Sequence, residues 1–123
     1  MAGVVLIVDD NEHLRTIAAL TLHSHGYEIV EATTKQEAIE KTLPKHPNLI
    51  LLDIDLPDTR GTKVARAIKR DPTAHDIPII GWSALFGRDF RQTALDAGMA
   101  EYFVKPVSPA LLLETIAQFI GRS

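Results

Sequence analysis

Hydrophobic residues are grouped in short blocks along this chain, and the blocks predict β-strands. Three of them, residues 4–8, 49–52 and 77–80, are unbroken apolar runs rich in branched side chains, with no alternation between apolar and polar positions. Such runs are typical of strands that are covered on both faces of a sheet. Two weaker blocks, residues 27–31 and 102–104, bring the expected number of strands to five.

The segments between these strands have the periodicity of helices. One expected helical face recurs at every third or fourth position and consists of Leu14, Ile17, Ala18, Thr21 and Leu22. Gly26 follows it, and we expect this glycine to end the helix in a left-handed conformation. Thr34 and Glu37 have the spacing of a capping box, which predicts a second helix that ends before Pro44.

Three further helices are expected in the second half of the chain. The apolar positions that mark the third and fourth are Val64, Ala65 and Ile68, then Phe90, Ala94 and Ala97. Asp71 and Pro72 are expected to end the third helix, and Gly98 the fourth. Ser108 and Pro109 suit the start of a fifth. The side chains expected to face inward from the fifth helix are Leu112, Thr115, Ile116 and Phe119.

Strands that alternate with helices five times predict an α/β fold. We expect a three-layer, doubly wound (βα)5 domain with a five-stranded parallel sheet and helices on both faces. With the strand order 2-1-3-4-5, which is the flavodoxin-like arrangement, the first and third strands are neighbours at the switch point of the sheet. The functional loops then follow the carboxyl ends of the strands.

Composition narrows the classes of function. The chain has 123 residues, enough for one compact domain, and carries a net charge of −3 with no stripe of basic residues, so direct nucleic-acid binding is not expected. It contains no cysteine, and its apolar run at residues 4–8 is too short for a secretion signal or a membrane span. We expect a cytoplasmic protein without membrane insertion.

Polar residues gather at the predicted carboxyl ends of the strands. They are Asp9, Asp10, Asp53, Ser83 and Lys105. Three carboxylates in one pocket repel one another and require a cation, and Mg²⁺ suits carboxylate and phosphate oxygens. A lysine and a hydroxyl group would suit the negative oxygens of a phosphoryl group, and Asp53 would be the nucleophile that accepts it.

These residues stand in motifs that together resemble the response-regulator receiver family. The motifs are Val8-Asp9-Asp10-Asn11, Leu51-Leu52-Asp53-Ile54-Asp55-Leu56-Pro57 followed by Gly61, Ser83-Ala84, and Tyr102-Phe103-Val104-Lys105-Pro106. The resemblance covers essentially the whole chain. It implies that residues 1–123 are a single receiver domain without an output domain, and that this domain belongs to a two-component system.

The resemblance also implies a role for each site residue. Asp9 and Asp10 would hold Mg²⁺, with Asp10 the more direct ligand, and the Asp53 carboxylate and the Asp55 backbone carbonyl would complete the protein's share of the metal shell. Asp53 would accept a phosphoryl group from a histidine kinase or a histidine phosphotransfer protein. Ser83 and Lys105 would bind the phosphoryl oxygens.

By the same resemblance, phosphorylation is expected to change the surface that the domain presents to its partners. Tyr102 would turn inward when Ser83 moves, and the surface formed by the fourth helix, fifth strand and fifth helix would then control a downstream protein partner. The domain would catalyse only its own phosphorylation and dephosphorylation, and would not otherwise be an enzyme. The cognate kinase and the target are not indicated by the sequence.

Two alternatives stand beside this interpretation. Asp53 and Asp55 also resemble the Asp-x-Asp motif of haloacid-dehalogenase-type phosphatases, in which the second aspartate is the acid and base, although that family places the motif after its first strand. The other alternative is a receiver-like interaction module that is never phosphorylated. Trp82 is an unusual residue to precede Ser83, and the pattern fits either a core position or an exposed contact.

Overall fold

The computed structural model describes residues 3–54, 60–84 and 88–120 of the chain. Strands and helices alternate throughout these ranges, as the sequence predicts. The strands are β1 (Val4–Val8), β2 (Glu28–Ala32), β3 (Leu49–Asp53), β4 (Ile79–Ser83) and β5 (Glu101–Val104). The helices are α1 (Glu12–His23), α2 (Lys35–Lys45), α3 (Gly61–Arg70), α4 (Arg88–Asp96) and α5 (Pro109–Ile120).

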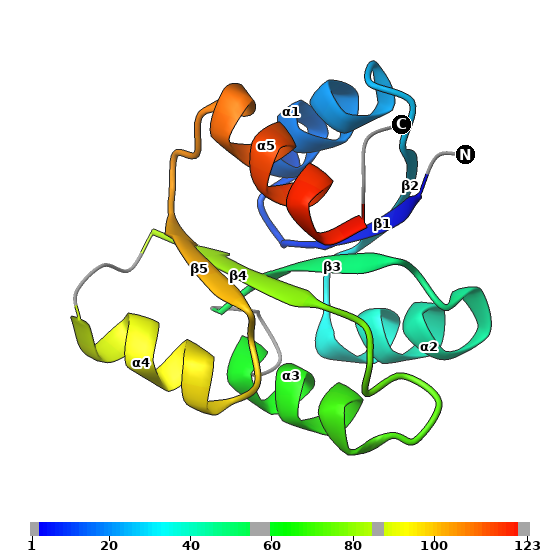
Figure 1. The fold of residues 1–123 in the computed structure, drawn as a ribbon, viewed down its shortest axis with the longest axis vertical. Helices are drawn as coiled ribbons and strands as arrows, with labels where there is room; N and C mark the ends of the chain where they lie inside the picture. The colour runs from blue at the N-terminus through cyan, green and yellow to red at the C-terminus, as the bar shows by residue number, and fades with distance from the viewer. Residues whose placement is uncertain (1–2, 55–59, 85–87, 121–123) are drawn as a thin grey trace.

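The five strands form one parallel sheet in the order β2-β1-β3-β4-β5. Figure 1 shows α1 and α5 on one face of this sheet and α2, α3 and α4 on the other. The predicted three-layer α/β fold and its strand order are therefore confirmed. Because β1 pairs with both β2 and β3, the carboxyl ends of β1 and β3 lie side by side.

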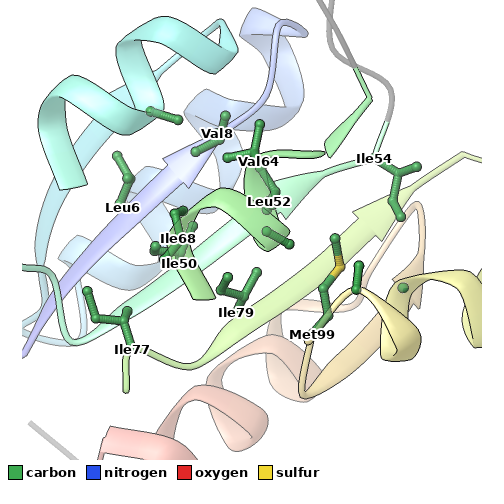
Figure 2. Packing of buried hydrophobic residues seen from close by; sticks show 14 of the residues in the cluster. Leu6, Val8, Ile50, Leu52, Ile54, Val64, Ile68, Ile77, Ile79 and Met99 are labelled. Atoms are coloured by element: carbon green, nitrogen blue, oxygen red, sulfur yellow. The ribbon is translucent and has the colours of Figure 1, made fainter. Parts of the chain in front are cut away.

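Each face of the sheet carries its own apolar cluster, which explains the unbroken hydrophobic runs. Leu6, Val8, Ile50 and Leu52 belong to the cluster beneath α2, α3 and α4, part of which Figure 2 shows. The alternate residues of the same strands belong to the cluster beneath α1 and α5; they are Val5, Ile7, Leu49 and Leu51. Full burial of one such side chain contributes about 1.5 to 3 kcal/mol, so both faces stabilise the sheet.

Polar side chains cap the helices, as the sequence indicates. The Thr34 hydroxyl accepts a hydrogen bond from the Glu37 backbone N–H at 3.1 Å. The Glu37 carboxylate reaches back to Thr33, one residue earlier than a capping box requires, and accepts bonds from its N–H and hydroxyl. These two bonds lower the pKa of Glu37. Ser108 caps α5 through the Leu111 N–H at 3.1 Å.

Two expected boundaries are wrong. Helix α2 includes Pro44, although a stop before this residue was expected. A proline in the last turn removes one backbone hydrogen bond but is compatible with helical φ, and the helix ends one residue later. Strand β4 spans Ile79–Ser83 instead of residues 77–80, because the Ile77 N–H closes a turn onto the Ala74 carbonyl at 3.1 Å.

Two side chains expected to face inward are exposed. Phe119 is 41% exposed, and its neighbour Ile120 packs against the core of α5 and the sheet instead. Ile17 of α1 is 45% exposed, whereas Ala18 and Leu22 on the same helix are buried. In both helices the buried stripe is narrower than the apolar stripe in the sequence, because one sheet face supports only part of each helix.

Candidate functional site

Four of the predicted site residues meet at the carboxyl edge of the sheet. Asp9 directly follows β1, Asp53 ends β3, Ser83 ends β4 and Lys105 follows β5. Lys105 Nζ lies 2.6 Å from Asp9 Oδ2 and 3.2 Å from Asp53 Oδ2. Together with Asp10, these side chains line a hollow of about 400 Å³. The parallel sheet thus brings together residues that lie up to 96 positions apart.

The site combines buried negative charge with a single lysine. Asp9 is fully buried, Asp53 is 4% exposed and the Lys105 side chain is 10% exposed, whereas Asp10 is exposed at the rim. One ammonium group does not balance three ionised carboxylates. Among the described residues, Asp9, Asp10 and Asp53 offer carboxylate oxygens that all lie within 4.8 Å of one another. This set of hard oxygen donors fits Mg²⁺.

Asp9 is held rigidly by its neighbours. Its backbone N–H donates to the Ala32 carbonyl at the end of β2, at 3.0 Å, and its Oδ1 accepts from the Asn11 N–H at 2.9 Å. Arg15 of α1 donates to the Asp9 carbonyl at 2.8 Å and pairs with Glu31 at 2.9 Å. Arg15 carries no signal of this role in the sequence, because its partners are a backbone oxygen and a residue of another element.

A close approach of two backbone segments positions Asp53. The Gly61 N–H, at the start of α3, donates to the Ile54 carbonyl, next to the end of β3. A Cβ atom at Gly61 would overlap the Asp53 carbonyl oxygen and would lie 2.9 Å from Ile54 Cα. Gly61 therefore allows α3 to begin directly against β3, a geometric role that agrees with its place in the sequence motif.

Ser83 and Tyr102 connect the site to β5. Both side chains are buried, with 1% and 5% exposure, and they share a hydrogen bond. Burial raises the pKa of the Tyr102 phenol, the negative charge of Asp53 raises it further, and the bond with Ser83 and the Lys105 charge act in the opposite direction. The Lys105 N–H donates to the Ser83 carbonyl at 2.7 Å. Tyr102 thus faces inward beside Ser83.

Trp82 occupies a core position, which resolves the two possibilities left open by the sequence. It is 4% exposed and belongs to the apolar cluster beneath α1 and α5. Its ring also reaches the site, since Lys105 Nζ lies 4.9 Å from the ring centroid. The unusual residue type before Ser83 was the one sequence signal for this contact.

The structure therefore brings together Asp9, Asp10, Asp53, Ser83 and Lys105, with Tyr102 beside Ser83. Asp55 and Pro57 lie outside the described residues. The acidic pair follows β1 and the candidate acceptor ends β3, which is not the placement of the phosphatase alternative. In the parts of the chain that the structure describes, no helix combines the length and apolarity needed to cross a bilayer.

Comparison with known sequences finds the family described as the response regulator receiver domain, which matches residues 5–117. The polar-differentiation response regulator DivK of Brucella ovis is 31% identical over 121 residues, which are 98% of each chain. The phosphate regulon transcriptional regulatory protein PhoB of Pseudomonas aeruginosa is 39% identical over 119 residues. The match covers 97% of this chain but 52% of PhoB, so the chain spans about half of that relative.

Comparison with solved structures gives the same result. A CheY-like receiver domain protein from Methanospirillum hungatei has a TM-score of 0.89 at 30% identity, covering 96% of this chain and 93% of its own. The chemotaxis response regulator CheY4 of Vibrio cholerae has a TM-score of 0.90 at 26% identity, covering 97% and 99%. Neither the phosphatase nor the other alternative is favoured by these matches. The chain belongs to the response regulator receiver domains, signalling domains of two-component systems that are not enzymes in the ordinary sense.

Proposed function

We propose that Asp53 is the phosphoacceptor of this receiver domain. The observation that carries the proposal is the position of its carboxylate, 3.2 Å from the Lys105 ammonium and within 4.8 Å of oxygens of Asp9 and Asp10. A buried nucleophile that lies close to both a lysine and an acidic cluster suits the transfer of a group with several negative oxygens. Asp53 has both.

The proposed donor is the phosphohistidine of a histidine kinase or histidine phosphotransfer protein. A carboxylate oxygen of Asp53 attacks phosphorus, the P–N bond breaks, and the imidazole leaves with the electron pair and takes up a proton. Lys105 and the Ser83 hydroxyl then bind phosphoryl oxygens. Attack by water on the same phosphorus releases inorganic phosphate, so the domain catalyses its own phosphorylation and dephosphorylation only.

The proposed cofactor is Mg²⁺, held by Asp9, Asp10 and Asp53 together with the backbone carbonyl of Asp55. When bound, the ion neutralises charge on the carboxylates and on the phosphoryl oxygens. The exposed Asp10 side chain lies at the rim, where an ion can exchange its waters for protein oxygens. Asp9 is buried and already paired with Lys105, so its main contribution to a bound ion would be negative charge at a fixed position.

The proposed output passes from Ser83 through Tyr102 to the surface formed by α4, β5 and α5. The hydrogen bond between these two side chains supports this route, because a phosphoryl group that engages the Ser83 hydroxyl changes the contact beside which Tyr102 already faces inward. The target would be a protein rather than nucleic acid, met in the cytoplasm. We also propose that residues 1–123 are one receiver domain, with no output domain among them.

The test is the intact mass of the protein after incubation with acetyl phosphate and Mg²⁺. We expect one added phosphoryl group, which is lost in Asp53→Asn and after chelation of the metal. Asp96→Asn is the matched control, because it makes the same chemical change at an exposed position of α4 and should keep the adduct. An adduct that persists in Asp53→Asn would contradict the proposal.

A further inference from the structure

Trp82 contacts both the apolar core and Lys105 of the candidate site, and core packing alone does not explain the second contact. It is the one tryptophan of the chain and precedes Ser83 at the end of β4. Its side chain belongs to the apolar cluster beneath α1 and α5, together with Ile80. The ring also lies under Lys105, whose ammonium group is 4.9 Å from the ring centroid. This distance is within the range of a cation–π contact.

The indole N–H indicates that the ring is not there merely to fill space. In the described part of the chain, Trp82 Nε1 is the buried side-chain nitrogen or oxygen atom that has no hydrogen-bond partner. A buried donor without an acceptor is destabilising, and a leucine or phenylalanine at this position would avoid it. The feature that a tryptophan adds is its large, electron-rich face, which is the part that meets Lys105.

We propose that Trp82 is a positioning residue that holds the Lys105 ammonium group between Asp9 and Asp53. The part of this inference that concerns phosphoryl transfer rests on the function proposed above. The two carboxylates attract the ammonium group at 2.6 and 3.2 Å, and the face of the Trp82 ring adds a third contact at 4.9 Å from its centroid. A lysine side chain is long and flexible, so three fixed contacts restrict it where one would not.

Trp82 is held rigidly because it lies in a central part of the sheet. Strand β4 is paired on both sides, and Trp82 itself stands opposite Asp53 of β3 and Phe103 of β5. Trp82 also accepts, through its carbonyl, the Ile54 N–H at 3.3 Å. The ring is thus fixed to the same backbone that carries Asp53. Lys105 is positioned relative to the acceptor, and its ammonium is ready for the phosphoryl oxygens when they arrive.

The first test observes the contact itself and does not require phosphorylation. The ring current of an indole displaces protons above its face, so the Lys105 ε-methylene resonances should lie upfield of those of the other lysines. We expect Trp82→Phe to keep part of this displacement and Trp82→Leu to abolish it. Identical Lys105 shifts in the wild type and in Trp82→Leu would overturn the proposal.

The second test measures the consequence, as the initial rate at which acetyl phosphate adds to Asp53 at saturating Mg²⁺. We expect Trp82→Leu to slow this rate about fivefold and Trp82→Phe to slow it less than twofold. Ile80→Ala is the matched control, since Ile80 lies in the same strand and cluster without a contact to Lys105 among those described. It should lose stability and keep its rate.

The two tests separate the inference from the function on which it rests. If Ile80→Ala slows the transfer as much as Trp82→Leu does, the effect is one of packing and the positioning role is wrong. If the folded wild type takes up no phosphoryl group, the proposed function fails, and the Lys105 resonances still decide whether Trp82 positions the lysine.

Discussion

The two edges of the sheet each hold a partly buried lysine, and the two lysines have different partners. At the carboxyl edge, Lys105 contacts the carboxylates of Asp9 and Asp53. At the amino edge, Lys69 from the last turn of α3 donates to two backbone carbonyls, those of His75 at 3.1 Å and Ile77 at 2.8 Å. Lys105 thus joins residues that lie 96 and 52 positions away, whereas Lys69 reaches residues only six and eight positions further along the chain.

The difference shows that burial of an ammonium group does not by itself indicate a reactive site. The carbonyl partners of Lys69 are neutral and fixed in the loop before β4, so the contact secures a turn. Loss of solvent lowers the pKa of Lys69, and the charge of Asp76 partly opposes this. The partners of Lys105 are carboxylates beside a hollow, which can bind a metal ion or accept a group. The chemistry of the partner distinguishes the functional edge from the structural one.

The largest expected effect on stability comes from replacing a glycine with alanine, and it differs between Gly61 at the carboxyl edge and Gly98 at the amino edge. Gly61→Ala places a methyl group onto the Asp53 carbonyl oxygen, which the backbone on both sides prevents from moving. We expect it to lower the free energy of unfolding by about 4 kcal/mol and to displace Asp53. In Gly98→Ala the added Cβ approaches the flexible Lys69 side chain, with Cγ at 2.8 Å. The backbone at this position also has a φ of +99°, which alanine rarely adopts. This substitution should cost about 1 to 2 kcal/mol.

Urea denaturation of both variants measures these costs, and phosphoryl uptake from acetyl phosphate measures their effect on the site. Gly98→Ala should keep a normal uptake rate when folded, since it lies at the other edge. Equal losses of stability in the two variants would show that the contact between α3 and the acceptor strand is less rigid than the structure indicates.

The next effect comes from replacing each lysine with methionine. Lys105→Met leaves Asp9 and Asp53 as a buried carboxylate pair without their cation, and we expect a loss of about 3 kcal/mol in the free energy of unfolding. Mg²⁺ should restore part of this loss, because it supplies positive charge to the same oxygens. Phosphoryl uptake should fall about a hundredfold.

Lys69→Met is the comparison variant. It removes two hydrogen bonds to backbone carbonyls and should cost about 2 kcal/mol. This loss should be the same with and without Mg²⁺, and uptake should remain close to that of the wild type. Denaturation in Mg²⁺ and in chelator checks both variants, and an equal Mg²⁺ response in the two would remove the distinction between the edges.

The smallest expected effect is a decrease in the free energy of unfolding at alkaline pH, caused by ionisation of Tyr102. The folded protein raises the pKa of Tyr102 above the value of an unfolded tyrosine, mainly through burial. The folded state therefore favours the neutral phenol, so the stabilisation is complete below about pH 10 and is lost as the pH rises through the folded pKa.

Tyr102→Phe should lose this dependence. We expect the free energy of unfolding of the wild type to fall more steeply between pH 9 and pH 11 than that of the variant, in urea titrations at each pH. Other groups that titrate in this range are common to both proteins and cancel in the difference. Parallel pH profiles would show that the Tyr102 phenol ionises freely in the folded state.

The fold was predictable because the strands are buried on both faces. Unbroken apolar runs located β1 and β3, the alternation of elements predicted a parallel sheet, and the strand order was the one expected for a flavodoxin-like arrangement. The same signal misplaced β4, because Gly81 has no strand preference of its own. In the structure, a Cβ at this position would lie 2.6 Å from Met99 Sδ, so glycine avoids displacing a neighbour that sequence periodicity does not reveal.

The candidate site was predictable to the extent that its residues end strands. Asp9, Asp53 and Ser83 could be placed at one edge from topology alone. Contacts that depend on side-chain reach could not be placed in this way, and these include Arg15 on the Asp9 carbonyl and Trp82 beneath Lys105. They join elements whose separation depends on the packing of α1 and the twist of the sheet.

The separation of the charged residues along the chain affects how the domain assembles. Asp9 and Asp53 precede Lys105 by 96 and 52 positions. A ribosome therefore delivers the acidic side chains, with the four strands that carry and flank them, before it delivers the lysine that pairs with them. Until then the nascent chain lacks Lys105, which contacts both aspartates in the folded domain. Docking of the last strand relieves their repulsion, so electrostatics favours completion of the sheet over a stable intermediate without β5.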